Sequence, residues 1–256
     1  MRNCIGKTVS LIVLTATAFA AQAAPSLLII YSGSTPPTAQ MLASGKFSAV
    51  TSFDAGAGTP TLGQLLAVDN ILAFSNSVPL NPSGLGDALA SAVDAGRHVT
   101  IMTYGQSLPW AITGRMQTAG YNPLKVATNG DVSGNIVATQ PSDPVFVGVN
   151  LAAVTFFHNS NFAHPTLDGG ATLLATDGAG VNMIARNATG SVIGANLFPD
   201  ASEPNNNAMF YTLVANLALG QGVSREIPTL SEWGLVAMAV LLVAIAIPFL
   251  RRRRAA

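Results

Sequence analysis

Residues 70–103 decide the fold class and read NILAFSNSVPLNPSGLGDALASAVDAGRHVTIMT. The stretch begins and ends with short apolar runs, 70–75 and 98–103, which are typical of buried strands. Between them, Asn81-Pro82 marks a helix start, because Asn caps helices and Pro is favoured at the first helical position. The helix template of apolar side chains is then filled without a miss by Leu85, Ala88, Leu89, Ala92 and Val93. Strand, crossover helix and strand together predict a parallel sheet.

Working outward, the same kind of pattern extends the sheet in both directions. Residues 26–31 and 49–53 are further strand candidates on the N-terminal side. On the C-terminal side we expect strands at 172–176, 181–186 and 191–197, separated by the turn sequences Asp177-Gly178 and Asn187-Ala188-Thr189-Gly190. A closing helix is predicted after Pro204 and ends at Gly220 and Gly222, with an apolar face made of Phe210, Leu213, Val214, Leu217 and Ala218. The prediction is a single α/β domain with a mostly parallel sheet.

Composition narrows the function classes. The chain has 256 residues, 49% hydrophobic and only 9% charged, which excludes a charged disordered protein. Residues 24–226 contain 6 Lys and Arg against 11 acidic residues, so this body has a net charge of −5. Mild acidity with no basic run argues against binding to nucleic acid.

The N-terminus has the three parts of an export signal. Arg2 and Lys7 precede an apolar run, and Ala21-Gln22-Ala23 supplies the small residues that signal peptidase requires. Residues 1–23 are therefore predicted to be removed. Cys4, the single cysteine, lies in this segment, so the mature chain is expected to have no thiol, no disulfide and no cysteine metal ligand.

The C-terminus predicts a membrane anchor. From Trp233 to Leu250 there are 18 residues without a charge, about 27 Å of helix at the usual rise, which is enough to span a thin bilayer. Trp233 has the position of an interfacial aromatic residue. The cationic end that would stay in the cytoplasm consists of Arg251, Arg252, Arg253 and Arg254. This arrangement predicts a single membrane helix with residues 24–226 on the outer side.

The same tail carries a recognisable motif directly before the helix. It consists of Ile227, Pro228, Thr229, Leu230, Ser231, Glu232, Trp233 and Gly234. Motif, helix and arginine cluster in this order resemble the IPTL-type C-terminal sorting signal of Gram-negative bacteria. The resemblance implies recognition by an exosortase, a membrane enzyme that cuts near the motif and passes the body on toward the surface. The expected segments are a signal peptide (1–23), an exported domain (24–223), a linker with the motif (224–232), a membrane helix (233–250) and a basic tail (251–256).

The body itself resembles the class I glutamine amidotransferase-like fold, a flavodoxin-like arrangement. The similar features are the helix end Asp94-Ala95-Gly96, the turn Thr103-Tyr104-Gly105-Gln106 and the segment 143–149. In that family the turn holds a catalytic Cys, and a His-Pro-Glu follows the last core strand. Here Thr103 stands in the place of the Cys, and the last strand is followed by Asn196-Leu197-Phe198-Pro199. The resemblance therefore implies the fold without the catalytic residues.

Thr103 is a weak nucleophile candidate on chemical grounds as well. A hydroxyl needs an adjacent base, whereas a thiolate is nucleophilic near neutral pH. The nearest histidine in sequence, His98, begins the same strand, about 16 Å away along an extended chain. A tight turn that ends a central strand explains Thr103-Tyr104-Gly105 equally well.

Two other groups of residues are candidates for a site. His158, His164 and Asp168 are a histidine–carboxylate cluster of a type that suits zinc, although their spacing matches no metal signature. Tyr104, Gln106 and Trp110 follow the strand at 98–103 and are candidates for lining a ligand cleft at the carboxyl end of the sheet. No bound cofactor is expected.

These observations predict an exported protein, anchored in the inner membrane with its body in the periplasm and then passed to the surface or released. The expected function is a non-catalytic binding module for a surface polysaccharide or matrix ligand. Two alternatives stay open: an exported hydrolase that uses Thr103 or the 158–168 loop, and a purely structural surface protein. Proximity of His158, His164, Asp168 and Thr103 around one pocket would favour the hydrolase.

Overall fold

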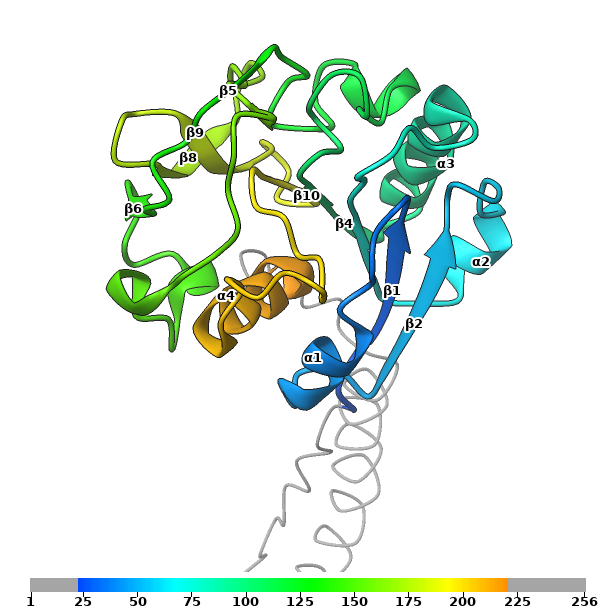
Figure 1. Ribbon diagram of the computed structural model, residues 1–256. Helices are drawn as coiled ribbons and strands as arrows, with labels where there is room; N and C mark the ends of the chain where they lie inside the picture. The colour runs from blue at the N-terminus through cyan, green and yellow to red at the C-terminus, as the bar shows by residue number, and fades with distance from the viewer. Residues whose placement is uncertain (1–22, 221–256) are drawn as a thin grey trace, which may run out of the picture.

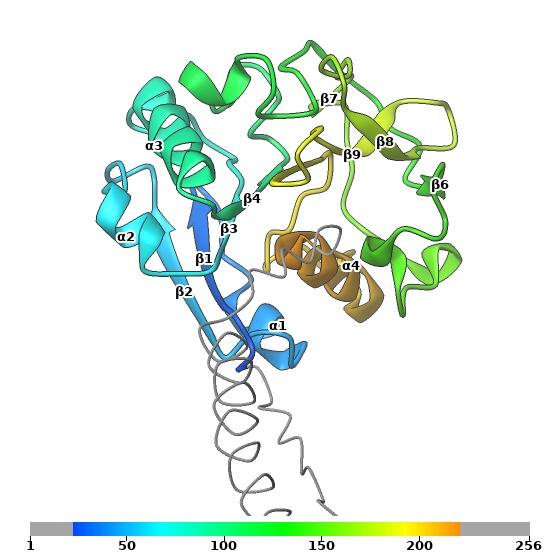
Figure 2. The same cartoon turned by 180° about the vertical axis from the view of Figure 1, so that it is seen from behind.

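The computed structural model describes residues 23–220, and these form a mixed sheet with helices on both faces (Figures 1 and 2). The eight-stranded sheet has the order β2-β1-β3-β4-β10-β9-β8-β6. Its strands are β1 (Ser26–Tyr31), β2 (Ala49–Asp54), β3 (Asn70–Ala73), β4 (His98–Met102), β6 (Val137–Ala138), β8 (Thr172–Thr176), β9 (Asn182–Arg186) and β10 (Val192–Ala195). A separate two-stranded sheet pairs β5 (Asn129–Gly130) with β7 (Phe162–Ala163).

The first half of the sheet is parallel, as the sequence predicts. β1 pairs with β2 and β3, β3 pairs with β4, and β4 pairs with β10, all in parallel. The central strands β3 and β10 are buried along their whole length, because helices cover both faces of the sheet. All five strands therefore end at the same edge, called the carboxyl edge below, and begin at the opposite, amino edge.

Helices sort onto two faces and create two cores. α1 (Thr38–Ala43) and α4 (Ala208–Leu219) cover one face, and α2 (Leu62–Leu66) and α3 (Pro82–Asp94) cover the other (Figure 1). The larger core contains Phe74 and Phe198 together with the apolar face of α4, while the smaller one contains Leu85 and Leu89 of α3. The structure also has three short 3-10 helices, η1 (Gly114–Gln117), η2 (Pro144–Phe146) and η3 (Leu151–Ala153).

The crossover helix forms for the reasons visible in its sequence. The Asn81 side chain accepts a hydrogen bond of 2.9 Å from the Gly84 N–H and caps the helix, with Pro82 in the first turn. Leu85 and Leu89 are buried as expected, while Val93 keeps some exposed surface. After the last turn, Gly96 adopts a φ of +89°, which L side chains rarely adopt.

The second half of the sheet is antiparallel, which confirms both predicted hairpins. β8 pairs with β9 around Asp177, whose carboxylate accepts from the N–H groups of Ala179 and Val181 at 2.8 and 2.7 Å. β9 pairs with β10 through the turn at 187–190.

Some expectations need correction. The strands predicted to extend to Ser75, Thr103 and Leu197 end at Ala73, Met102 and Ala195, because the chain turns at the carboxyl edge. The short helices α1 and α2 and the strand β6 were not expected. Within residues 23–220 no helix is long and apolar enough to cross a membrane, and the predicted membrane helix at 233–250 lies outside these residues.

Candidate functional site

Thr103 and Asn196 meet at the carboxyl edge, each directly beyond the end of a central strand. Both residues have no exposed surface. The Thr103 hydroxyl donates to Asn196 Oδ1 at 2.7 Å, and Asn196 Nδ2 donates to the carbonyl of Ala163 at 2.7 Å. Each polar atom of this pair therefore has a partner inside the protein.

This arrangement does not activate the hydroxyl. A nucleophilic hydroxyl must pass its proton to a base, and an amide oxygen is not a base near neutral pH. The described structure gives the Thr103 hydroxyl one partner, the Asn196 amide. His98 begins β4 and Thr103 follows its end, so the two lie at opposite edges of the sheet.

Tyr104 fills the space beside this pair instead of lining an open cleft. The residue is 3% exposed, and its ring lies 5.1, 5.2 and 5.6 Å from the rings of Phe198, Trp110 and Phe162, measured between centroids. Its hydroxyl donates to Asn159 Oδ1 at 3.1 Å. Burial raises the pKa of Tyr104 to about 12, so this hydroxyl stays protonated in the neutral range. Trp110 is partly buried at the outer side of this aromatic cluster.

Gln106 is also fully buried, but unlike Thr103 and Tyr104 its side chain has no hydrogen-bond partner within residues 23–220. Neither its amide nitrogen nor its amide oxygen has a hydrogen-bond partner among the described residues, and the same holds for the hydroxyl of the buried Ser107. Its main-chain carbonyl accepts from the Ala127 N–H at 3.3 Å. Buried polar atoms are normally paired, so this amide marks a place where a bound water fits.

The structure does not bring His158, His164 and Asp168 together into a metal site. His158 is exposed beside the Phe156 ring, and the His164 ring bonds to the carbonyl of Asp131 at 2.9 Å. Among residues 23–220 no three His, Cys, Asp or Glu side chains form a group that could hold a metal ion.

Asp168 has a structural environment of its own. Its carboxylate accepts from the Gly120 N–H at 2.6 Å and lies 3.2 Å from Lys125 Nζ. Burial opposes ionisation of this carboxyl, but these two contacts hold its pKa below the ordinary value. Asp168 therefore joins two loops as a paired anion.

A pair of carboxylates lies next to the start of α4. Asp200 is 4% exposed and accepts from the N–H groups of Thr35 and Ser202 at 3.2 and 2.8 Å. Burial and the neighbouring charge of Asp200 raise the pKa of Glu203. Through these hydrogen bonds, Asp200 connects the loop after β1 to the loop after β10.

A pocket that the sequence analysis did not predict lies at the opposite, amino edge of the sheet. It has a volume of about 480 Å³, within the range of sites that hold small ligands. Four separate segments form its walls, and it is lined by Val93, Asp94, Gly96, Arg97, His98, Ala119, Gly120, Tyr121, Thr189, Gly190, Ser191, Leu219 and Gly220. Because these segments are far apart in sequence, no local motif could have predicted it.

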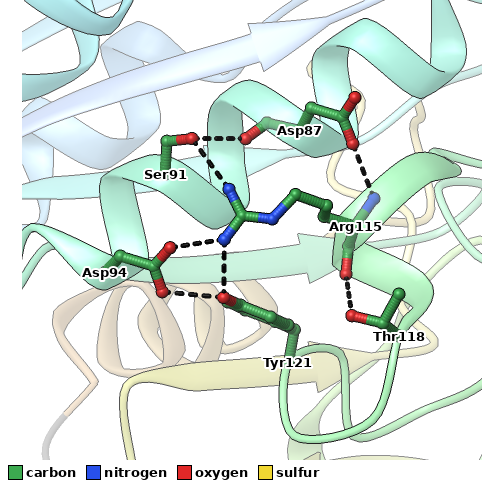
Figure 3. A network of polar contacts seen from close by, with 6 residues as sticks. All are labelled: Asp87, Ser91, Asp94, Arg115, Thr118 and Tyr121. Atoms are coloured by element: carbon green, nitrogen blue, oxygen red, sulfur yellow. Dashed lines mark hydrogen bonds and ion pairs between the residues drawn. The ribbon is translucent and has the colours of Figure 1, made fainter.

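One wall of this pocket is braced by a polar network around Arg115 (Figure 3). Arg115 Nη2 bonds to Asp94 Oδ2 at 2.5 Å and to the Tyr121 hydroxyl at 2.9 Å, and the Tyr121 hydroxyl donates to Asp94 Oδ1 at 2.7 Å. The hydrogen bond from Tyr121, followed by that from Arg115, lowers the pKa of Asp94. The network is exposed, so it fixes the 115–121 loop against α3 and adds little stability.

Solved structures share the fold of the body at low sequence identity. A glutamine amido transferase from Methylobacillus flagellatus matches with a TM-score of 0.50 and 13% identity, over 80% of this chain and 98% of that chain. A ThuA-like protein from Bacteroides uniformis matches with a TM-score of 0.49 and 11% identity, over 78% and 93% of the two chains. At 13% identity the likeness to the amido transferase shows the fold alone. No curated protein matches the chain.

The C-terminal segment gives a more specific match. The model of the IPTL-CTERM motif matches residues 227–254, which include the motif, the apolar stretch and the arginines. The expected resemblance is thereby confirmed for this part of the chain. The protein therefore carries an IPTL-CTERM sorting motif behind a body of amidotransferase-like fold, and this motif implies export, membrane anchoring and processing by an exosortase-type enzyme.

Proposed function

We propose that the protein is a sorted cell-envelope protein whose body is a non-catalytic binding module in the periplasm or at the cell surface. The observation that carries the proposal is the buried hydrogen bond between Thr103 and Asn196. At the two places where the resemblance puts a nucleophile and a base, the chain has a hydroxyl and an amide that satisfy each other.

Access argues in the same direction. A nucleophile must reach the substrate carbon at about 3–3.5 Å. Thr103 has no exposed surface, and the aromatic cluster of Tyr104, Trp110, Phe162 and Phe198 packs beside it. Opening a path would require moving several packed rings out of the core, which costs far more than a side-chain rotation.

The alternatives receive less support. A hydrolase centred on the 158–168 loop needs its histidines and carboxylate together, and they lie apart with separate partners. A purely structural role differs from the binding module in having no ligand, and the retention experiment below separates the two.

The placement of the chain end fits a display role. α4 ends at Leu219 at the amino edge, on the side where β1 begins (Figures 1 and 2). The sorting motif starts at Ile227, so the tether leaves from the amino edge and the carboxyl edge faces away from it. Open α/β folds usually bind ligands at the carboxyl edge, and we propose a surface polysaccharide or matrix component as the ligand of this body.

The catalytic part of the proposal is tested by glutamine hydrolysis. We expect no ammonia release from glutamine by the purified protein, and no difference between the wild type and Thr103→Val. Thr100→Val is the matched control, because Thr100 is equally buried on the same strand and its hydroxyl also donates one hydrogen bond, to the Leu217 carbonyl at 2.9 Å. Each variant should lose about 1 kcal/mol of stability. Glutamine turnover that disappears in Thr103→Val but survives in Thr100→Val would overturn the proposal.

The binding part is tested by retention on immobilised surface polysaccharide from the producing cells. The folded protein should be retained, and heat-unfolded protein should not. Equal passage of both through the column would favour the purely structural alternative.

A further inference from the structure

The pocket at the amino edge lies where the described body ends and the C-terminal segment begins. Gly220, the last described residue, forms part of its lining together with Leu219. Gly220 has a left-handed φ of +63°, and a Cβ added to it would lie 2.3 Å from His98 Nδ1. The residue is thus fixed against the pocket wall, and it is the attachment point of the chain that follows.

The lining offers a definite chemistry. Val93, Ala119 and Leu219 supply apolar surface, and the hydroxyls of Thr189 and Ser191 supply polar contacts. α3 and α4 both end here, so two helix C-termini direct partial negative charge toward this space.

The charged side chains around the pocket have partners for most of their polar atoms, and the buried Nε of Arg97 has none among the described residues. Arg97 Nη2 donates to the Leu66 carbonyl at 2.7 Å, at the end of α2, and Asp94 is shared between Arg115 and Tyr121. An occupant therefore has to bring its own hydrogen-bond donors and a small apolar side chain, and it does not need an opposing full charge.

We propose that the pocket binds the chain's own segment 221–226, Gln-Gly-Val-Ser-Arg-Glu. This segment connects the body to the sorting motif. Val223 is three residues beyond Gly220, a reach of up to about 10 Å, so its side chain can cover Val93 and Leu219. Arg225 brings donors to the two helix C-termini. Because the segment is covalently attached, its effective concentration is about millimolar and weak contacts are sufficient.

Docking of this segment sets how the sorting motif is presented. Ile227 follows directly, so a docked segment holds the start of the motif close to the body and an undocked one extends it by six residues. The pocket thereby controls the distance at which a processing enzyme meets the body.

The test is the alkylation rate of a single thiol in the full chain, with Cys4→Ser as background. In Val223→Cys, docking should slow the reaction with a maleimide. Adding Ala119→Trp, which fills the pocket rim at an exposed position, should raise the rate about tenfold, which corresponds to about 1.4 kcal/mol of docking free energy. The matched control is Ala152→Trp, an equally exposed alanine outside the pocket lining, which should leave the rate unchanged.

A second pair of variants leaves residues 23–220 untouched, so it cannot fail by unfolding the body. With the thiol at Ser224→Cys, the additional change Val223→Asn should raise the alkylation rate, and Val223→Ile should not. Equal rates in all variants, at the value of a free peptide of the same sequence, would overturn the proposal. Because none of these measurements involves glutamine or polysaccharide, its failure is distinguishable from that of the proposed function.

Discussion

We expect the protein to lose stability in mildly acidic solution because of a single residue, His98. The imidazole lies at the start of β4, enclosed between the end of α4 and the turn before β10. Its Nε2 bonds to the Leu217 carbonyl and to the Thr100 hydroxyl, each at 3.1 Å. The residue lines the pocket and keeps some exposed surface, and Gly220 lies directly against its ring.

This environment lowers the pKa of His98 from 6.5 to about 4. Burial is the largest cause, and the positive charge of Arg186 acts in the same direction, while hydrogen bonds to the backbone of Leu217 and Ser191 oppose it. Between these two pKa values the unfolded chain binds a proton that the folded protein does not bind. The stability that the neutral imidazole provides is therefore complete above about pH 6.5 and is lost as the pH falls toward about 4.

The magnitude follows from the two pKa values. A full shift of this size corresponds to about 3 kcal/mol, of which about 2 kcal/mol is lost between about pH 7.5 and about pH 5. Urea unfolding across this range should show that loss in the wild type. In His98→Gln, which keeps a donor for the Leu217 carbonyl, the pH dependence should be flatter by the same amount. Parallel stability curves for the two proteins would refute the reasoning.

Other features of the structure give further predictions. Leu89→Ala should lower the free energy of unfolding by about 2–5 kcal/mol in urea denaturation, because the side chain is fully buried, and a loss below about 1 kcal/mol would contradict its place in the core. Asp143→Asn should cost about 3–5 kcal/mol in the same assay, because it removes the charge that faces the largely buried Arg186 and one of the two acceptors, at 2.7 and 2.9 Å, for its guanidinium. Asp94→Asn, on an exposed pair, should cost under about 1 kcal/mol, and equal losses in both variants would contradict the difference in burial. A reporter fused after Ala256 should be active only in the cytoplasm, and periplasmic activity would reverse the predicted orientation.

Local patterns were enough to predict the elements whose stability comes from a repeated apolar face. β1 and β8 have the predicted bounds, and α3 begins at Pro82 as predicted. α1 and α2 could not be predicted in this way, because helices of five or six residues are held by tertiary packing. Each is anchored by one fully buried side chain, Met41 in α1 and Leu65 in α2, and one apolar residue makes no pattern.

The candidate site was only partly predictable for a similar reason. The sequence places Thr103 at the end of a central strand and Asn196 beyond the last one, but not the contact between them, which spans 93 residues. The burial of Tyr104 and Gln106 could not be predicted from the sequence either, because a residue that follows a strand can point to the cleft or to the core. The pocket is formed by four segments that are far apart in sequence, so no local pattern could predict it.

The contacts of Thr103 and Asn196 explain why two polar residues occupy this buried place at the carboxyl edge. A neutral hydrogen bond contributes only about 1 kcal/mol, so two apolar residues of similar shape would stabilise the protein about as well. Asn196, however, reaches several chain segments at once. Its N–H donates to the Met183 carbonyl of β9 at 2.6 Å, and its side chain reaches both Thr103 after β4 and Ala163 in β7. The Thr103 N–H in turn donates to the Leu197 carbonyl at 3.1 Å. An apolar pair would leave the Ala163 carbonyl without its donor and would not fix the register of these ends. The pair therefore serves to align the strand ends at the carboxyl edge, which is the property a rigid binding surface requires.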